Sequence, residues 1–227
     1  MSAMLSNALP FDRLVDACAS DWRAYIEHPF VRGMGDGSLP EASFRHYLKQ
    51  DYLFLVHFAR AWGLAVYKAR SMGELRQGLD ILKAIVDLEM GLHISWCAEW
   101  GVSEDDLAAL QESRATMAYT RYVLDAGASG DLLDLHVALA PCVVGYADVA
   151  SWLLAQPFLK RDGNPYMRWI DMYADAEFQQ AAQAERDWLN ARLAGVTPER
   201  LAQLSRIFRD ATRLEADFWQ MGLTLAD

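Results

Sequence analysis

The stretch Ala138–Ala150 reads ALAPCVVGYADVA and places Cys142 and Tyr146 one helical turn apart. Aliphatic residues recur around them at intervals of three, four and seven positions. A helix with this spacing points the thiol and the phenol toward the same inward face. A cysteine on such a face is either a small hydrophobe of the core or part of the floor of a pocket. The stretch alone leaves both interpretations open.

The chain of 227 residues is long enough for one substantial core, and 53% of its residues are hydrophobic. Its formal net charge of −10 argues against a nucleic-acid partner, because such binding depends on Lys and Arg contacts with phosphate. We expect no membrane-spanning segment, because no apolar run approaches ~20 residues. We expect no secretory signal, because MSAMLSNALPFDRL lacks a basic region before an apolar block. These observations predict a soluble cytoplasmic protein with a small neutral or cationic ligand.

The cysteines and histidines indicate neither a disulfide frame nor a metal site. Cys18, Cys97 and Cys142 form no CxxC pair and no zinc-binding spacing, so we expect reduced thiols. None of the five histidines completes the Glu-x-x-His pairs of a di-iron bundle. The nearest approach, Glu89 with His93, is interpreted as a helical side-chain pair. Hydrolase elbows, Walker loops and Rossmann glycine turns are absent. We therefore expect no metal and no cofactor.

Helical periodicity is nearly continuous and strand-type alternation is absent, which predicts one all-α domain over residues 1–227. Ser71 with Glu74, and Ser103 with Asp106, are predicted to cap helices. The segment HPFVRGMGDGSLP (28–40), rich in glycine and proline, is predicted to be a connecting loop. The predicted helices cover about 10–27, 40–70, 71–100, a short one from 103, 115–126 ending at Gly127, 131–155, 165–195 with a bend near Asp175, and 198–221.

Two carboxylates interrupt apolar helix faces, where a solvated helix would not carry them. Asp51 lies in FRHYLKQDYLFLVHF among large apolar residues, and Glu215 is framed in the same way by Phe208, Phe218 and Trp219. A buried, unpaired carboxylate costs several kcal/mol, so each must be hydrogen-bonded, paired or neutralised. An internal hydrogen-bond network or a buried ion pair would satisfy them. A polar pocket that also holds Cys142 is the alternative.

Tyrosines at helical spacing add aromatic surface with polar tips. Tyr119 with Tyr122, and Tyr166 with Tyr173 around Trp169, follow this pattern. Such residues belong by default to a core in which each hydroxyl finds a partner.

In combination, these residues resemble the TenA family, the thiaminase II enzymes. The similarity spans about residues 28–219 and keeps the order and spacing of six motifs. They are HPFVRGMGDGSLP for HPF-x-x-x-x-x-G-x-LP, QDYLFLVHF for QD-x-x-YL-x-x-F, LEMGLH for E-x-x-LH, PCVVGY for PC-x-x-x-Y, YMRWIDMY for Y-x-x-WI-x-x-Y, and LEADFW for E-x-x-FW.

This resemblance implies a helical-bundle fold like that of haem oxygenase, without haem, assembled as a homotetramer. The implied activity is aminopyrimidine hydrolysis in thiamin salvage, acting on C–N bonds. The substrate would be 4-amino-5-aminomethyl-2-methylpyrimidine, hydrolysed to the hydroxymethyl compound, with cleavage of thiamin as a second reaction. The preferred leaving group and the physiological substrate stay open.

The family's functional residues correspond to positions in this chain. The nucleophile corresponds to Cys142, the catalytic acid to Glu215 and the pyrimidine-binding aspartate to Asp51. The pocket tyrosines correspond to Tyr119, Tyr146 and Tyr173. Phe54 departs from the pattern, because the family commonly has a tyrosine there, and one polar contact is lost with the hydroxyl. The cysteine assigns the chain to the cysteine-bearing branch.

The chemistry needs these residue types. Thiolate addition at a ring carbon breaks aromaticity, after which electron push from the 4-amino side can expel an amine or a thiazole. Glu215 would relay protons, and its apolar frame would raise its pKa towards neutrality. Asp51 would read the amidine edge of the ring, with Phe54 and Tyr146 on the two faces. The rival hypotheses are a non-catalytic aminopyrimidine-binding protein and a helical metal-dependent oxygenase.

Overall fold

The computed structural model describes residues 9–227, and every regular element in this range is helical. The expectation about a secretory signal rests mainly on residues 1–8, which lie outside the described residues. The elements are α1 (Pro10–Ala17), α2 (Ala19–Ile26), α3 (Pro29–Asp36), α4 (Glu41–Lys68), α5 (Met72–Ala84), the π-helical segment η1 (Ile85–Glu89), α6 (Met90–Glu99), α7 (Glu104–Ala108), α8 (Arg114–Ser129), α9 (Leu132–Leu154), α10 (Met167–Ala174), α11 (Ala176–Leu193) and α12 (Pro198–Thr224).

Side-chain caps fix the starts of several helices. The Ser71 hydroxyl accepts from the Glu74 amide at the start of α5, and Glu74 accepts from the Ser71 amide in return. Ser103 and Asp106 form the same reciprocal pair at α7. Both predicted capping boxes are confirmed, and each satisfies two amides that a helix start leaves unpaired.

The segment predicted to be a loop contains a helix, so that prediction was wrong. His28 caps α3 by accepting a hydrogen bond from the Phe30 amide through Nδ1 (3.2 Å), and Pro29 occupies the first helical position. Gly37 ends the helix in the left-handed region, with φ of 76°. A proline just inside a helix start and a glycine just after its end are helix boundary signals as well as loop signals. Here the proline and the glycine are so close in sequence that the eight-residue helix between them was interpreted as part of one loop.

Three other boundaries depend on single residues. The first predicted helix is broken at Cys18, whose φ of −133° is not helical. The helix expected to stop at Gly127 continues to Ser129. A Cβ at Gly127 would lie 2.6 Å from Leu135, so this glycine permits close contact with α9 rather than ending a helix. The predicted bend near Asp175 is confirmed, because this residue is extended between α10 and α11.

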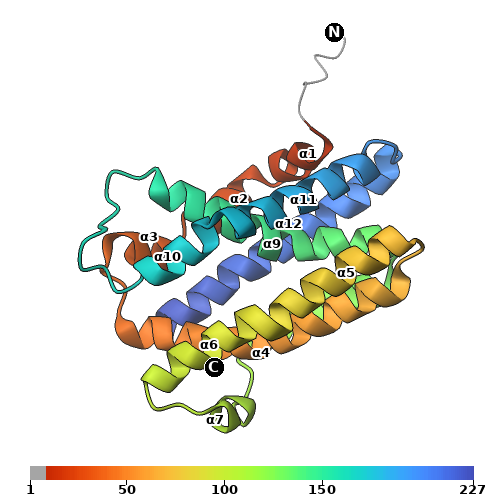
Figure 1. Ribbon diagram of the computed structural model, residues 1–227. Helices are drawn as coiled ribbons and strands as arrows, with labels where there is room; N and C mark the ends of the chain where they lie inside the picture. The colour runs from red at the N-terminus through yellow and green to blue at the C-terminus, as the bar shows by residue number, and fades with distance from the viewer. Residues whose placement is uncertain (1–8) are drawn as a thin grey trace.

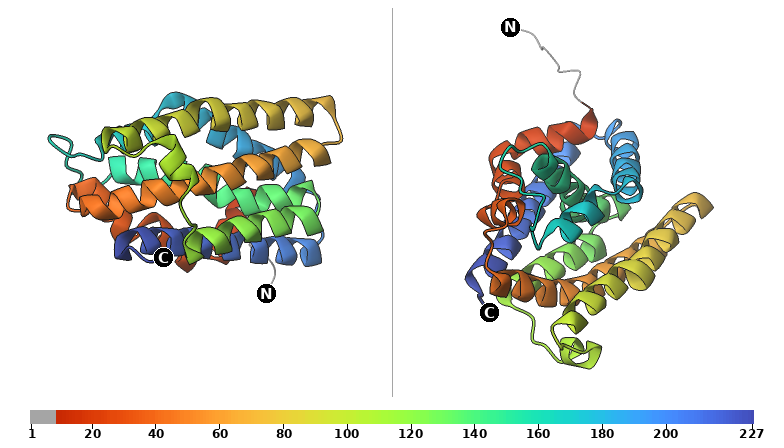
Figure 2. Two further views of the ribbon diagram at one scale, coloured as in Figure 1. Left: turned by 90° about the horizontal axis from the view of Figure 1, so that it is seen from below. Right: turned by 60° about the vertical axis from the view of Figure 1, so that its left-hand side comes forward.

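Helix α9 lies at the centre of the arrangement (Figure 1). It packs against α8, α10, α11 and α12, while α4 packs against α5 and α8 on another side. Figure 2 shows α4 and α5 running side by side along one edge of the molecule. The helix that carries the cysteine motif therefore contacts elements from both ends of the chain.

The position of α9 accounts for its apolar composition. It has 23 residues with a mean hydropathy of 1.6 over its most apolar window, enough by length and composition to cross a membrane. This differs from the expectation that no apolar run would reach that length. Within the protein, 67% of that window is buried. A helix covered on most of its surface by other helices needs apolar residues all round.

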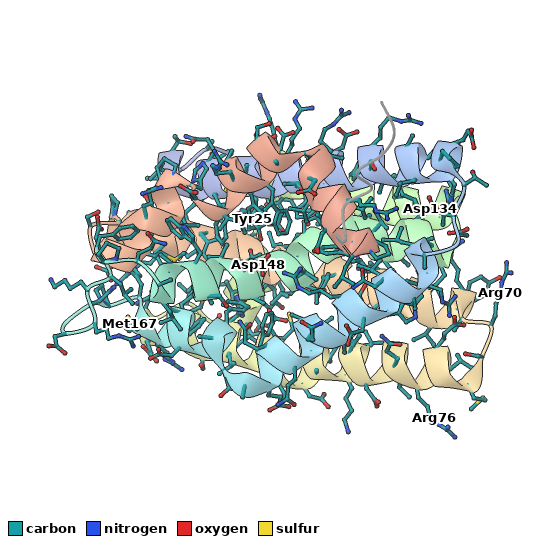
Figure 3. The ribbon with its side chains drawn as sticks, turned by 90° about the horizontal axis from the view of Figure 1, so that it is seen from above. Tyr25, Arg70, Arg76, Asp134, Asp148 and Met167 are labelled. Carbon is teal, nitrogen blue, oxygen red and sulfur yellow. The ribbon has the colours of Figure 1, made fainter. Side chains whose placement is uncertain are left out.

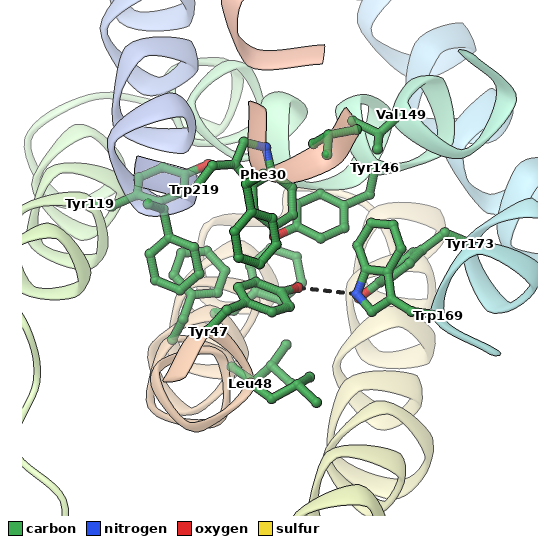
Figure 4. Packing of buried hydrophobic residues seen from close by; sticks show 14 of the residues in the cluster. Phe30, Tyr47, Leu48, Tyr119, Tyr146, Val149, Trp169, Tyr173 and Trp219 are labelled. Carbon is green, nitrogen blue, oxygen red and sulfur yellow. Dashed lines mark hydrogen bonds between the residues drawn. The ribbon is translucent and has the colours of Figure 1, made fainter. Parts of the chain in front are cut away.

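Aromatic side chains fill the main core. Trp62, Trp169 and Trp219 are each no more than 1% exposed, and tyrosines and phenylalanines from α2, α4, α8 and α12 pack among them. Figure 4 shows part of this cluster. In contrast, Arg70 and Arg76 project outward at the α4–α5 turn (Figure 3).

A close contact between α2 and α9 fixes the helix beside the cysteine. Pro141 lies inside α9 and supplies no amide hydrogen. The Tyr25 hydroxyl donates to the Pro141 carbonyl (3.1 Å), and the Tyr25 ring passes over Gly145. A Cβ on Gly145 would lie 2.4 Å from a Tyr25 ring carbon and 2.7 Å from its hydroxyl oxygen. The absence of a side chain at Gly145 is therefore what allows Tyr25 to reach the turn that bears Cys142.

Replacing Gly145→Ala should destabilise the protein by about 1–3 kcal/mol, because the added methyl must displace the buried Tyr25 ring. Gly91→Ala in α6 is the matched control, since a Cβ there meets nothing within 4 Å. Helix propensity alone should make that control more stable by about 0.5–1 kcal/mol. Urea unfolding of both variants measures the difference. Equal effects of the two substitutions would contradict this account.

Candidate active site

The carboxylate of Asp51 lies in a buried network on α4 and α6. The Tyr47 hydroxyl donates to Asp51 Oδ2 (3.0 Å), and His93 Nε2 lies 2.7 Å from the same oxygen. Tyr47 accepts in turn from the Trp169 indole nitrogen (3.3 Å; Figure 4). Asp51 is 3% exposed and His93 is fully buried. Both contacts use Oδ2, so the second oxygen of the carboxylate takes no part in either.

The other ring nitrogen determines the charge of His93. Nδ1 lies 2.9 Å from the main-chain carbonyl oxygen of Glu89, and a carbonyl can only accept, so Nδ1 carries a hydrogen. Burial opposes charge on the imidazole, but the hydrogen bond and charge of Asp51 outweigh it and raise the pKa of His93. The contact between Nε2 and Oδ2 is therefore a buried salt bridge whenever the imidazole carries its second proton, a state that Asp51 favours. This arrangement realises the buried ion pair considered for Asp51 from the sequence.

Glu215 occupies an aromatic environment on α12. It is 1% exposed, and its Oε1 accepts a hydrogen bond from the Tyr119 hydroxyl (2.8 Å). Burial raises its pKa from 4.5 to about 8; Tyr119 partly opposes this shift and the negative charge of Asp51 adds to it. The Tyr119 ring centroid lies 5.0 Å from that of Phe54, which in turn lies 5.7 Å from that of Phe218. Three elements thus form the apolar frame that the sequence predicted for this acid.

Cys142 follows Pro141 on α9 and is only partly covered. Burial raises the pKa of its thiol well above the ordinary value, and Glu215, Glu89 and Asp51 raise it further through their negative charges. The charges of three carboxyl groups, from three helical segments, therefore act on one sulfur. The thiol is protonated at neutral pH, so a base must take its proton before it can act as a nucleophile.

The predicted aromatic residues fall into two groups. Phe54 packs with Tyr119 and Phe218, whereas Tyr146 packs with Tyr173 (4.9 Å between centroids) and with Trp169 and Trp219. All of the residues predicted for the site therefore lie in one region, around Cys142. Phe54 and Tyr146, which were expected to sandwich a ring, make no direct ring contact with each other among the described aromatic pairs.

Sequence reasoning missed Glu89 and His93 as members of this region. It interpreted them as a side-chain pair on one helix, but His93 binds the main chain of Glu89 and the side chain of Asp51. The Glu89 carboxylate accepts instead from the Tyr173 hydroxyl (3.2 Å). The available signal was their placement on the face that also carries the buried residues Ile85 and Trp96.

Two small clefts are lined by other residues, apart from Phe54. One is lined by Phe54, His57, Phe58, Thr120 and Val123. The other is lined by Ala65, Glu74, Gln77, Gly78, Leu132, His136 and Trp188. Neither is lined by Cys142. Across residues 9–227, no three His, Cys, Asp or Glu side chains are grouped as a metal ion would require.

The architecture and the site define a class: a helical protein with a partly buried thiol surrounded by carboxyl groups and tyrosines. The sequence pattern of the TENA/THI-4/PQQC family matches residues 16–225, and the chain belongs to this family. An aminopyrimidine aminohydrolase of Halalkalibacterium halodurans is 36% identical, covering 88% of this chain and 89% of that protein. An uncharacterized protein of Haemophilus influenzae is 46% identical, covering 95% and 99%.

Solved structures agree with this assignment. A protein of Silicibacter sp., described as a TenA family transcription regulator, has a TM-score of 0.88 at 42% identity, covering 95% of this chain and 96% of that one. A Shewanella denitrificans domain with a heme oxygenase-like fold has a TM-score of 0.71 at 14% identity, covering 98% and 94%. The predicted fold class, all-α and haem oxygenase-like, is confirmed.

Substituting Glu215→Gln should stabilise the protein increasingly as the pH rises. Between about pH 4.5 and pH 8 the unfolded chain releases a proton that the folded chain retains, so the native protein loses about 1.4 kcal/mol per pH unit in this window. Glutamine does not titrate and can still accept from Tyr119. The gap in Tm between variant and parent should therefore widen from pH 5 to pH 8.

Thermal unfolding at several pH values measures this gap. Glu99→Gln is the control, because Glu99 lies at the surface in an exposed pair with Arg168. A constant gap for Glu215→Gln across the whole range would show that burial does not perturb the carboxyl group.

Proposed function

We propose that this protein is an aminopyrimidine hydrolase of thiamin salvage. Its substrate would be 4-amino-5-aminomethyl-2-methylpyrimidine, which it hydrolyses to the hydroxymethyl compound, and thiamin would be a second substrate. The observation that carries the proposal is the presence of Asp51 and Glu215, both buried and each hydrogen-bonded to a tyrosine, in the same aromatic core against which Cys142 packs. The name of the Halalkalibacterium halodurans relative supports the same reaction.

The protonation states of these groups suit such a reaction. With a pKa of about 8, Glu215 is largely protonated at neutral pH. A protonated carboxyl can donate from one oxygen and accept at the other, so Glu215 can pass the Cys142 proton to a ring nitrogen while sulfur attacks a ring carbon. The proton moves from sulfur to ring without a free charge forming in the apolar core.

Substrate recognition is assigned to Asp51 and the aromatic side chains. Because Oδ2 of Asp51 is engaged by Tyr47 and His93, its second oxygen is the one that would accept from the amino group of the pyrimidine. Phe54 and Tyr146 would contact the flat ring. Phe54 has no hydroxyl group to hydrogen-bond the substrate. On the side of the ring that Phe54 contacts, Tyr119 would have to provide that hydrogen bond.

A non-catalytic aminopyrimidine-binding protein is the second candidate. One observation favours it: the pKa of the Cys142 thiol is raised rather than lowered, as in an inert buried cysteine. Incubating the protein separately with the aminomethyl pyrimidine and with thiamin, and following release of the pyrimidine alcohol, separates the candidates. Tight binding measured by calorimetry with no product would support the binding protein.

We also propose that the protein forms a homotetramer and resides in the cytoplasm. Apolar side chains are exposed at regular intervals on α5 and η1, at Met72, Leu79 and Val86. Such a surface supports contact with further copies in the proposed homotetramer. Light scattering of the purified protein would give its mass in solution. All three cysteines are free, in keeping with a reducing cytoplasm.

Replacing Cys142→Ser should reduce turnover of the aminomethyl pyrimidine by about 1,000-fold or more, because the covalent route is removed. Binding of the pyrimidine should persist, since recognition is assigned to other side chains. Turnover assays and calorimetry on the same preparation measure both effects.

Cys18→Ser is the matched control. Cys18 is a buried cysteine outside the site, and its thiol donates to the Leu14 carbonyl, a contact that a serine hydroxyl can reproduce. Turnover by Cys142→Ser at the level of this control would remove the nucleophile assignment.

A further inference from the structure

The proposed reaction leaves Glu89, a carboxyl group hydrogen-bonded to the pocket tyrosine Tyr173, without a role. Glu89 lies on η1 and is partly covered, and its Oε1 accepts a hydrogen bond from the Tyr173 hydroxyl of α10 (3.2 Å). Its charge is close enough to Cys142 to raise the pKa of the thiol, second only to Glu215 among the acids. Glu89 therefore belongs to the space around the sulfur, although its main-chain carbonyl also holds His93.

The π-helical turn directs this side chain inward. Ile85, Glu89 and His93 follow one another at steps of four, and both outer members are buried. Eight residues of regular α-helix exceed two full turns by about 80°, so Ile85 and His93 would lie toward opposite edges of one broad face. A π-turn is wider and absorbs part of this rotation. Val86 and Leu88, within the same turn, are more than half exposed.

The two glutamates approach the site from different sides. Glu215 is hydrogen-bonded to Tyr119 of α8, and Glu89 to Tyr173 of α10. Figure 4 shows Tyr119 and Tyr173 at opposite ends of the aromatic group, with Tyr47 and Trp219 between them. Two Glu–Tyr pairs therefore lie at the two ends of this aromatic group. One carboxyl can serve the ring while the other serves the group that leaves it.

Ionisable groups on four helices surround Glu89. Asp51 comes from α4, His93 from α6, Cys142 from α9 and Tyr173 from α10. Burial raises the pKa of Glu89 to about 7; His93 and Tyr173 oppose the shift and Asp51 adds to it. At slightly alkaline pH the side chain is mainly a carboxylate, the form that attracts a cation.

We propose that Glu89 binds the exocyclic ammonium group of the aminomethyl pyrimidine and then takes a proton from the water that replaces it. This role rests on the proposed function, which it deepens by assigning the leaving-group side of the site. It also selects between ligands: a pyrimidine with a cationic aminomethyl group binds Glu89 better than one with a neutral hydroxymethyl group.

In the first half of the reaction, the sulfur of Cys142 bonds to a ring carbon, and the thiol proton passes through Glu215 to a ring nitrogen. The bond between the methylene and the ammonium nitrogen then breaks. The electron pair of this bond leaves with the nitrogen as ammonia. The lone pair of the ring amino group is delocalised through the ring and supplies electrons to the methylene carbon that has lost the bond.

The second half restores every group. Water oxygen bonds to the methylene carbon and gives a proton to the Glu89 carboxylate. The sulfur–carbon bond breaks with its electron pair on sulfur, and Cys142 recovers the ring-nitrogen proton through Glu215. Ammonia takes the proton from Glu89 and departs as ammonium. The net change is the aminomethyl cation plus water to the alcohol plus ammonium.

The test compares two ligands that differ only in the leaving position. Glu89→Gln keeps the size of the side chain and removes its charge. At pH 7.5 calorimetry should show its affinity for the aminomethyl pyrimidine reduced by about tenfold or more. Its affinity for the hydroxymethyl pyrimidine should change by less than about threefold, and turnover should fall with the amine affinity. Asp87→Asn, an exposed neighbour on the same π-turn, should match the parent for both ligands.

Equal loss of affinity for both ligands, or none for either, would overturn the proposal, because a purely structural role does not distinguish amine from alcohol. If Glu89→Gln does not fold by circular dichroism, Glu89→Asp gives the same comparison. Its shorter carboxylate should lower the preference for amine over alcohol severalfold, and an unchanged preference would overturn the proposal. Failure of the proposed function appears separately, as a parent protein that produces no pyrimidine alcohol.

Discussion

The ion pair between His93 and Asp51 sets the electrostatic state of the whole site. The main-chain carbonyl of Glu89 fixes a hydrogen on one imidazole nitrogen, and Asp51 meets the other at 2.7 Å. Within the aromatic core, this contact gives the buried carboxyl group of Asp51 a hydrogen-bond partner that can carry the compensating charge. Glu89 and Glu215 have no such partner, so burial moves the pKa of each toward neutrality. The His93–Asp51 pair thus distinguishes the three acids: Asp51 is suited to substrate recognition, and Glu89 and Glu215 are suited to proton transfer.

The fold holds these groups in place with contacts that are mostly steric. Tyr25 on α2 reaches across Gly145 to the carbonyl of Pro141, one residue before the cysteine. Glycine is needed at that position, because any Cβ would overlap the tyrosine ring. The helix that bears the thiol is fixed from outside by this contact and surrounded on its other sides by α8, α10, α11 and α12. Precise placement of the sulfur follows from dense packing of large rings rather than from a network of polar bonds.

From the sequence, we could predict those site residues that stand out against the pattern of their own helix. Asp51 and Glu215 were recognisable because a carboxylate within an apolar helix face must be compensated. The partner of Asp51 could not be read in the same way, since His93 lies 42 positions away and pairs across two helices. The inward orientation of Glu89 did have a signal, because Glu89 lies on the helix face that also carries the buried residues Ile85 and Trp96. The π-turn itself could not be read from the sequence, since 3.6-residue periodicity does not reveal one. The helix between Pro29 and Asp36 was missed because its boundary residues also occur in loops.

The raised pKa of Cys142 has a consequence for the durability of the protein. Peroxides and electrophiles attack thiolates, and a thiol that keeps its proton reacts with them slowly. Burial, which is the main cause of the raised pKa, therefore shields the sulfur from chemical damage while no ligand is bound. A ring nitrogen that accepts the proton would lift this protection only when a suitable heterocycle is in place. Reactivity of the sulfur would then be conferred by the molecule it is meant to attack.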